Sequence, residues 1–89
     1  MKYTVTFTAG ALQDLASLDA SIRQRIVNKI EHYRDSGQPL RFAKTLQGAP
    51  QKLYRFRIGD YRVIFRLQLG RQANVIDVIR VGHRREIYD

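Results

Sequence analysis

Residues 53–67 read LYRFRIGDYRVIFRL, and this stretch decides the fold. Two alternating runs flank the pair Gly59-Asp60, and a Gly-X pair in that position favours a two-residue type II′ turn. The stretch therefore predicts a β-hairpin. With that turn, Arg57 lies directly opposite Arg62 on the neighbouring strand.

The predicted hairpin separates apolar side chains from arginines, because side chains alternate between the two faces of a strand. We expect its core face to carry Tyr54, Phe56, Ile58, Tyr61, Val63 and Phe65. The opposite face carries Arg55, Arg57, Arg62 and Arg66. Like charges placed directly across a strand pair destabilise it, whereas guanidinium groups bind phosphate well. We interpret the arginine face as an anion-binding surface; the alternative is a solvated face that only keeps the chain soluble.

The composition indicates one small globular domain, residues 1–89. At 44% hydrophobic residues the chain can form a core, although a chain this short buries only about 60–65% of its unfolded surface. The net charge is +8, and arginine outnumbers lysine 12 to 4. Bidentate contact with phosphate explains this arginine bias better than solubility does. The charge therefore predicts an acidic partner, either nucleic acid or an acidic protein.

The sequence excludes several other kinds of site. It contains no cysteine, which excludes disulfides and thiolate metal sites. Its two histidines are far apart and form no metal-ligand cluster. No apolar run is long enough to span a bilayer, and no basic amphipathic helix indicates a membrane partner. We expect a soluble, cytoplasmic protein without a metal or cofactor.

One strand and two helices are predicted before the hairpin. Residues 3–8 alternate as a half-buried strand does, and apolar residues recur at helical spacing over residues 12–18. Asp19 or Ser21 caps a second helix, and Ser21 with Gln24 fits a capping box. The apolar stripe of this second helix consists of Ile22, Ile26, Val27, Ile30 and Tyr33.

The remaining segments complete the predicted sheet. Residues 38–52 read as a long loop, held to the body of the protein by Phe42 and Leu46. After the hairpin, residues 75–81 form a last, central strand, which Gly82 ends. The tail, residues 83–89, is expected to form one helical turn. The predicted order is β-α-α-β-β-β plus this turn, an α+β fold with an antiparallel sheet and an N-terminal helical hairpin packed on one face.

A candidate site for chemistry combines the hairpin arginines with the C-terminal tail. Arg84 and Tyr88 are four residues apart and share one face of a helical turn. If the last strand pairs with the strand of residues 61–69, the tail emerges beside the arginine face. The candidate set is then Arg55, Arg57, Arg62, Arg84 and Tyr88, with His83 as a candidate acid or base.

Such a set suits cleavage of an RNA backbone by its own 2′-hydroxyl, which needs neither a metal ion nor an external nucleophile. Arginines orient the strand and stabilise the charge on phosphorus, but guanidinium is not deprotonated in proteins. Protons must therefore pass through Tyr88, His83 or the surroundings of the RNA. Alternatively, Tyr88 only covers the core and His83 is a turn residue. Arg66, Lys52 and Arg85 are expected to bind RNA outside the reacting phosphate.

These motifs resemble the RelE/ParE family of bacterial and archaeal type II toxins, and its RelE branch in particular. The resemblance covers essentially the whole chain. It includes the strand and helical hairpin, the L-x-G segment at Leu46–Gly48, the Tyr-Arg hairpin, and VGHRREIY at residues 81–88. Length and basic charge agree with the family as well.

The resemblance implies a toxin of a toxin–antitoxin system that is a ribosome-dependent endoribonuclease. RelE toxins enter the ribosomal A site, cut the mRNA codon there and halt translation. An acidic RelB-like antitoxin neutralises them by wrapping the toxin, and the complex contacts operator DNA through the antitoxin. The implied partners are thus mRNA, the ribosome and an antitoxin.

The family's functional residues match five positions of this chain. Two basic residues on the first hairpin strand fall at Arg55 and Arg57, and the hairpin arginine falls at Arg62. The arginine and the tyrosine of the tail fall at Arg84 and Tyr88. The best-known members carry lysines at the first two positions, and a lysine can carry a proton. Two alternatives stay open: a ParE-like inhibitor of DNA gyrase, which shares the fold but lacks the nuclease set, and a non-catalytic RNA-binding module.

Overall fold

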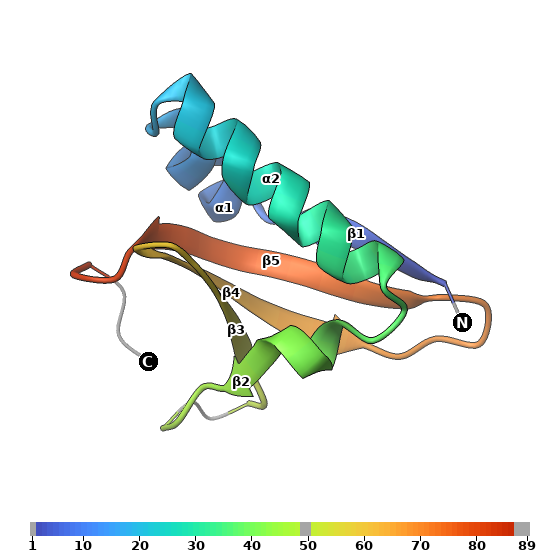
Figure 1. Cartoon of the computed structure of the whole chain (residues 1–89). Coiled ribbons are helices and arrows are strands. Elements are labelled where there is room, and N and C mark those ends of the chain that lie inside the picture. The colour runs from blue at the N-terminus through green and yellow to red at the C-terminus, as the bar shows by residue number, and fades with distance from the viewer. Residues whose placement is uncertain (1, 49–50, 87–89) are drawn as a thin grey trace.

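The computed structural model describes residues 2–48 and 51–86, and it shows two helices on one face of a five-stranded sheet (Figure 1). The elements in chain order are β1 (Tyr3–Phe7), α1 (Ala9–Ala16), α2 (Ala20–Asp35), the 3₁₀ helix η1 (Pro39–Phe42), β2 (Ala43–Thr45), β3 (Tyr54–Ile58), β4 (Tyr61–Gln68) and β5 (Asn74–His83). The strand order across the sheet is β1-β5-β4-β3-β2. The predicted α+β class, with a helical hairpin on one face, is confirmed.

The sheet differs from the prediction in two respects. β1 runs parallel to β5, so the sheet is mixed and not antiparallel throughout. The direction of β1 is set by the last strand of the chain, and no local pattern encodes it. In addition, the predicted loop of residues 38–52 contains β2, which pairs antiparallel with β3. A strand of three residues shows too little alternation to be recognised in a sequence.

The hairpin of β3 and β4 forms as predicted. The two strands are antiparallel, with Ile58 opposite Tyr61 and Arg57 opposite Arg62. Gly59 has a φ of 60°, and among the described residues only glycines have positive φ. A positive φ at the first central position alone is what a type II′ turn requires. The turn therefore fixes which side chains face the helices.

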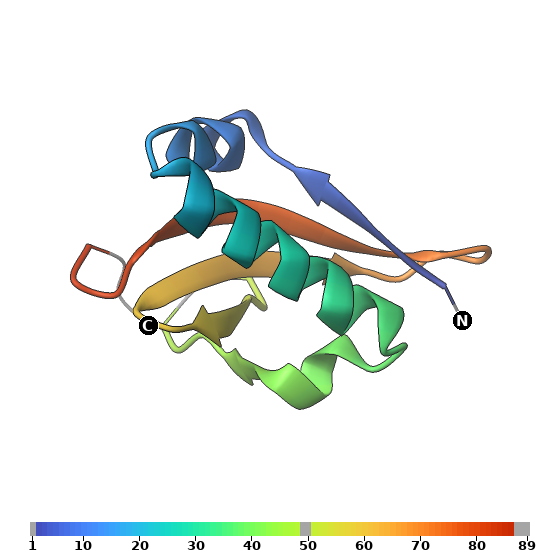
Figure 2. The same ribbon diagram turned by 45° about the horizontal axis from the view of Figure 1, so that its top comes forward.

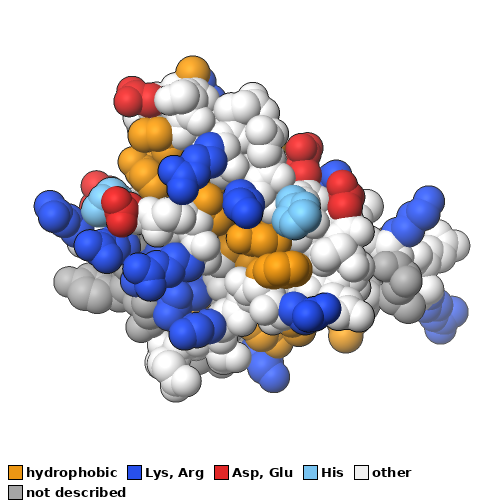
Figure 3. All heavy atoms as spheres, in the orientation of Figure 1, with side chains coloured by type: hydrophobic (Ala, Val, Ile, Leu, Met, Phe, Trp, Pro, Cys, Tyr) orange, Lys and Arg blue, Asp and Glu red, His pale blue; other side chains and the backbone are white. Residues whose placement is uncertain are grey.

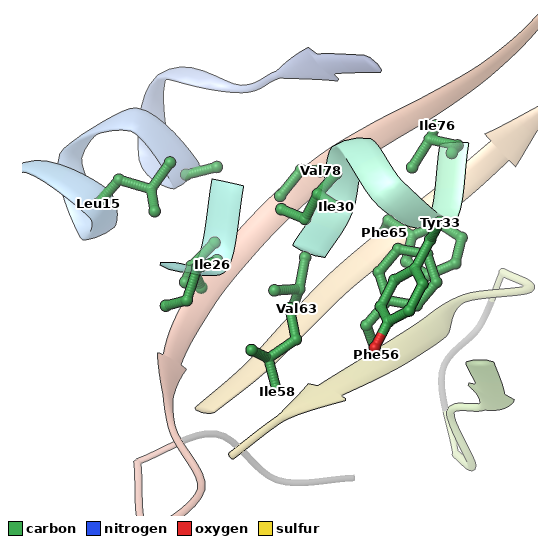
Figure 4. Packing of buried hydrophobic residues seen from close by; sticks show 12 residues of the cluster. Leu15, Ile26, Ile30, Tyr33, Phe56, Ile58, Val63, Phe65, Ile76 and Val78 are labelled. Carbon is green, nitrogen blue, oxygen red and sulfur yellow. The ribbon is translucent and has the colours of Figure 1, made fainter. Parts of the chain in front are cut away.

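The core lies between α2 and the sheet (Figure 4). From α2 it receives Ile26, Ile30 and Tyr33, all of them buried. The ring of Tyr33 packs against Phe56 with centroids 4.7 Å apart, and Phe56 stacks on Phe65 at 4.3 Å. All six apolar side chains predicted for the core face of the hairpin belong to this core. Truncating one of these buried phenylalanines to alanine would cost about 3–5 kcal/mol.

The starts of the two helices agree only in part with the prediction. α1 is capped by Thr8, whose Oγ1 accepts a hydrogen bond from a backbone N–H of the first turn. Asp19, one of the two predicted caps, occupies the N-cap position of α2, but its side chain forms no capping hydrogen bond, and Ser21 lies inside the first turn. The predicted capping box is wrong, because the amide of Gln24 donates a hydrogen bond to Asn28 instead, at 2.8 Å. In the described ranges, neither helix has the length and apolar character needed to cross a membrane.

β5 lies in the interior of the sheet, as predicted, but it is longer than predicted. It continues through a buried Gly82 to His83, so Gly82 does not end the strand. Relative to β4 it contains one extra residue, Ile79, which forms a bulge. Beyond the bulge, where β1 has ended, α1 lies along β5 (Figure 2). Oδ2 of Asp14 there accepts a hydrogen bond from the backbone N–H of Val81 at 2.9 Å, which fixes α1 to the strand.

Candidate functional site

The face of the sheet turned away from the helices, here called the outer face, carries the hairpin arginines. Arg57 and Arg62 lie directly opposite each other on it, and the Cβ atoms of such a pair are about 4.5–5.5 Å apart. Arg57 is exposed, whereas Arg55 and Arg62 are half-buried with buried Nε atoms. On its other side Arg62 lies opposite Gly82, which is buried. Positive charge is thus concentrated beside the β3–β4 turn.

The structure adds one cation that the sequence analysis missed. Lys44 on β2 is exposed and lies opposite Arg55 on β3. Side chains directly opposite each other share a face of the sheet, so Lys44 belongs to the outer face. No signal in the sequence could have revealed this placement, because residues 38–52 read as a loop and a loop has no register.

The segment after β5 returns to the β3–β4 turn. The backbone N–H of Arg84 donates a hydrogen bond to the carbonyl oxygen of Asp60 at 2.8 Å. Its Nε lies 3.9 Å from Oδ1 of Asp60, a distance that leaves only a weak ion pair. Lys and Arg side chains gather on the side of the molecule where this turn and the end of β5 lie (Figure 3). Arg84 therefore lies beside the β3–β4 turn; Tyr88, the remaining member of the predicted set, lies outside the described residues.

His83 is not brought to the outer face. It lies opposite Tyr61, and the two rings meet edge-on with centroids 5.4 Å apart, on the face that the helices cover. Its Nδ1 accepts a hydrogen bond from the backbone N–H of Arg85 at 3.2 Å. The side chains of Arg85 and Lys52 are exposed, one in the turn after β5 and the other just before β3.

Arg66 lies on the outer face but is held by a carboxylate. Its Nη2 and Nε donate to Oδ2 of Asp77 at 2.7 and 3.1 Å. The other oxygen of Asp77 accepts a hydrogen bond from the hydroxyl of Thr6 at 2.9 Å. The charge of Arg66 is therefore balanced within the protein. Within residues 2–48 and 51–86, no group of three or more His, Asp or Glu side chains is arranged to hold a metal ion.

The outer face also carries apolar side chains. Four apolar side chains form a second, small cluster on it, namely Leu46, Leu53, Ile64 and Ile79. The backbone N–H of Leu46 donates a hydrogen bond to the carbonyl of Leu53 at 2.8 Å, which ties the end of β2 to the start of β3. The predicted role of Leu46 in holding residues 38–52 to the body of the protein is confirmed. The apolar cluster thus separates Arg57 and Arg62, beside the β3–β4 turn, from Arg66 farther along β4.

Comparison with known families connects this arrangement to a biological class. Residues 5–88 match the family model described as "ParE toxin of type II toxin-antitoxin system, parDE". The chain belongs to the RelE/ParE family of type II toxins. The toxin is 34% identical over 89 residues to Toxin RelG of Mycobacterium tuberculosis (strain ATCC 25618 / H37Rv), a match that covers 99% of this chain and 98% of RelG.

Solved structures of RelE-type complexes share the fold of this toxin. The toxin–antitoxin complex RelBE2 of Mycobacterium tuberculosis has a TM-score of 0.77 at 29% identity, covering 94% of this chain and 100% of that one. The archaeal RelE–RelB complex of Pyrococcus horikoshii OT3 has a TM-score of 0.68 at 28% identity, covering 94% of this chain and 97% of that one. The intact RelBE complex of E. coli has a TM-score of 0.66 at 25% identity, covering 91% of this chain and 95% of that one. The resemblance inferred from the hairpin and tail motifs is thereby confirmed.

Proposed function

We propose that this toxin is a ribosome-dependent endoribonuclease that cuts mRNA in the ribosomal A site and so inhibits translation. The observation that supports it most is the pairing of Arg57 with Arg62 beside the β3–β4 turn. The two guanidinium groups lie on the same face of the sheet, where both can bind one anion. Guanidinium groups match the geometry of phosphate. The resemblance to RelE toxins makes mRNA the expected source of that phosphate.

In the proposed reaction, the 2′-hydroxyl oxygen bonds to the adjacent phosphorus and the bond from phosphorus to the 5′ oxygen breaks. The products are a 2′,3′-cyclic phosphate and a 5′-hydroxyl. Arg57 and Arg62 stabilise the negative charge that develops on the phosphate oxygens, and one preorganised contact of this kind contributes about 3–4 kcal/mol. Arg55 and Arg84 orient the RNA strand, which supplies a further part of the rate.

The proposed reaction depends on the ribosome, because the arginines cannot transfer protons. The ribosome orients the 2′-hydroxyl, and the activity of the toxin on free RNA is weak. Tyr88 stacks on a base or handles charge, and Tyr88→Phe separates these roles by keeping the ring and removing the hydroxyl. A large rate loss in Tyr88→Phe assigns the hydroxyl a role in the reaction. A small loss, together with a severe loss in Tyr88→Ala, assigns Tyr88 to stacking alone.

Cations beyond the reacting phosphate contribute to binding. Lys52 and Arg85 are exposed, and each contacts the RNA backbone on one side of the site. Arg66 contributes less, because Asp77 balances its charge. Losing one such contact weakens binding to all RNA sequences about equally.

The proposal includes an acidic RelB-like antitoxin as the partner of this toxin in the cytoplasm. RelE-type proteins of similar fold were solved in complex with RelB, and the charge of +8 attracts an acidic chain. The antitoxin, and not the toxin, makes the contact with operator DNA. The association rate should fall steeply as salt rises, because salt screens steering by net charge. A rate that stays flat from low to high salt contradicts this part of the proposal.

The deciding experiment compares two targets of the purified toxin. Ribosomes carrying a defined mRNA are incubated with the toxin, new 5′ ends are mapped by primer extension, and supercoiling by gyrase is measured in parallel. We expect a cut within the A-site codon and unchanged supercoiling. Arg62→Ala should abolish most of the cutting. Arg71→Gln removes one charge from the β4–β5 connection, at the opposite end of the sheet from the β3–β4 turn, and should behave as wild type (Figure 1).

Two other outcomes replace the proposal. If the mRNA stays intact and supercoiling is blocked, the toxin is a ParE-like gyrase inhibitor. The matching family model is itself described as a ParE toxin. Stable binding to ribosomes without any cleavage makes it a non-catalytic RNA-binding module.

A further inference from the structure

The cations of the outer face differ in one chemical respect. The arginines Arg55, Arg57 and Arg62 keep their protons at all working pH values, whereas a lysine ammonium can give up a proton and take it back. In the described part of the chain, Lys44 is the only lysine that lies in a strand. Among the cations that the strands place on the outer face, Lys44 is therefore the one that can also act as an acid.

The register of β2 fixes where this lysine points. β2 lies beside β3 at the edge of the sheet (Figure 1), and Lys44 pairs with Arg55. Its neighbours Ala43 and Thr45 pair with Phe56 and Tyr54, which face the core. Because side chains alternate along a strand, Lys44 is the one side chain of β2 on the outer face. It is exposed and accessible to a ligand there.

Two other acid–base groups near the arginines, His83 and Asp77, are placed differently. His83 lies against Tyr61 on the face that the helices cover. Asp77 is engaged by both Arg66 and Thr6. Among the described residues of the outer face, Lys44 is thus the group that combines exposure, proximity to Arg55 and an exchangeable proton.

We propose that Lys44 is the proton donor to the leaving group in the cleavage reaction, an inference that rests on the proposed function. As the 2′ oxygen bonds to phosphorus and the bond from phosphorus to the 5′ oxygen breaks, the ammonium of Lys44 gives its proton to the departing 5′ oxygen. The proton of the 2′-hydroxyl passes to water, and Lys44 is reprotonated from solvent. No atom is lost from the RNA, which ends as a 2′,3′-cyclic phosphate and a 5′-hydroxyl.

Two simpler roles must be separated from this one. A lysine on an edge strand discourages pairing with another sheet, and any cation on this face can bind phosphate. Both roles need only positive charge, so arginine fulfils them as well as lysine does. A proton donor is different, because arginine cannot replace it.

The test measures single-turnover cleavage of ribosome-bound mRNA at saturating toxin. We expect Lys44→Ala and Lys44→Arg to be slowed alike, by about 10²- to 10⁴-fold, the range typical of general acid catalysis. Lys29→Ala and Lys29→Arg are the matched controls, since Lys29 lies on α2 beside the ring of Tyr33, and they should cut at the wild-type rate. The melting temperatures of all variants are recorded, so that a folding defect is not read as a catalytic one.

A modified mRNA provides the second readout. Sulfur in place of the bridging 5′ oxygen at the cut site leaves as a thiolate and needs no proton. On this mRNA the cleavage rates of wild type and Lys44→Ala should differ by no more than about threefold, because the leaving group no longer needs a proton from a general acid. Wild-type cutting by Lys44→Arg, or an equally slow Lys44→Ala on both mRNAs, overturns the assignment and leaves the nuclease intact. A wild-type toxin that cuts neither mRNA overturns the proposed function itself.

Discussion

Arg66 lies directly opposite Asp77 in the β4–β5 pair, and its Nη2 is 2.7 Å from the carboxylate. Four residues earlier on the same strand and the same face, Arg62 lies opposite Arg57. The residues opposite these two arginines differ: a carboxylate lies opposite Arg66, and a second guanidinium lies opposite Arg62. Arg66 is part of the structure of the sheet, whereas Arg62 belongs to the cluster at its end.

This difference predicts unequal losses of activity. Arg62→Ala should slow cleavage of ribosome-bound mRNA by about 10²- to 10³-fold, the effect of removing one preorganised charge contact. Arg66→Ala should mainly weaken binding, with a rate at saturation within about tenfold of wild type. The Arg66 side chain is 38% exposed, so loss of its ion pair should cost no more than about 1 kcal/mol of stability. Equal rate losses in the two variants contradict this ranking.

Gly59→Ala should destabilise the toxin through two separate effects. A φ of 60° costs a residue with a Cβ about 1–2 kcal/mol. The added Cβ would also lie 2.8 Å from Nη2 of Arg25, whose guanidinium rests on the turn. Urea unfolding of Gly59→Ala, with and without Arg25→Ala, should show that the second change relieves part of the cost.

Gly37→Ala, made with and without Arg25→Ala, is the matched control for this double-mutant comparison. Its φ is 75°, but its added Cβ would meet nothing within 4 Å. Its cost should therefore be unchanged by Arg25→Ala, as expected for two sites without a shared contact. A coupling for Gly37 as large as that for Gly59 would rule out the contact with Arg25 as the cause.

Asp14→Ala should loosen α1 from β5. Oδ2 of Asp14 accepts hydrogen bonds from the backbone N–H of Val81 at 2.9 Å and from Nε of Arg80 at 3.2 Å. Leaving such a backbone donor without its acceptor costs about 1–3 kcal/mol. Hydrogen exchange of the Val81 amide should accelerate, and the amides of the β3–β4 pair should be much less affected. Asp14→Asn keeps an acceptor oxygen, so it should lose less stability than Asp14→Ala.

The exposed pair at the end of α2 predicts a small pH effect. Nε of Arg34 donates a hydrogen bond to Asp35 at 2.8 Å, and this bond holds the pKa of that carboxyl below its ordinary value. The folded state thus favours the ionised carboxyl. Its contribution is present above the unfolded pKa, about 4, and is lost as pH falls through the lower folded pKa. The difference in melting temperature between wild type and Asp35→Asn should be largest above about pH 5 and vanish near pH 2. High salt should reduce it.

The sequence by itself determined the hairpin, its register and the helical stripe that covers it. The pair Gly59-Asp60 selects the turn, and the turn together with alternation places Arg57 opposite Arg62. The stripe ending at Tyr33 follows from the helical period in the same way. These features depend on residues close together in the chain, so local physical rules suffice to predict them.

Only the tertiary structure decided the surroundings of those arginines. β1 takes its direction, and β2 its existence, from strands that are distant in the sequence. The placement of Lys44 beside Arg55 follows from the register of β2, and a shift of one residue would turn Lys44 to the other face. The register of β5 places Asp77 opposite Arg66, and it places His83 on the face away from the hairpin arginines. Local patterns set which side chains alternate, but the packing of distant strands sets which of them meet.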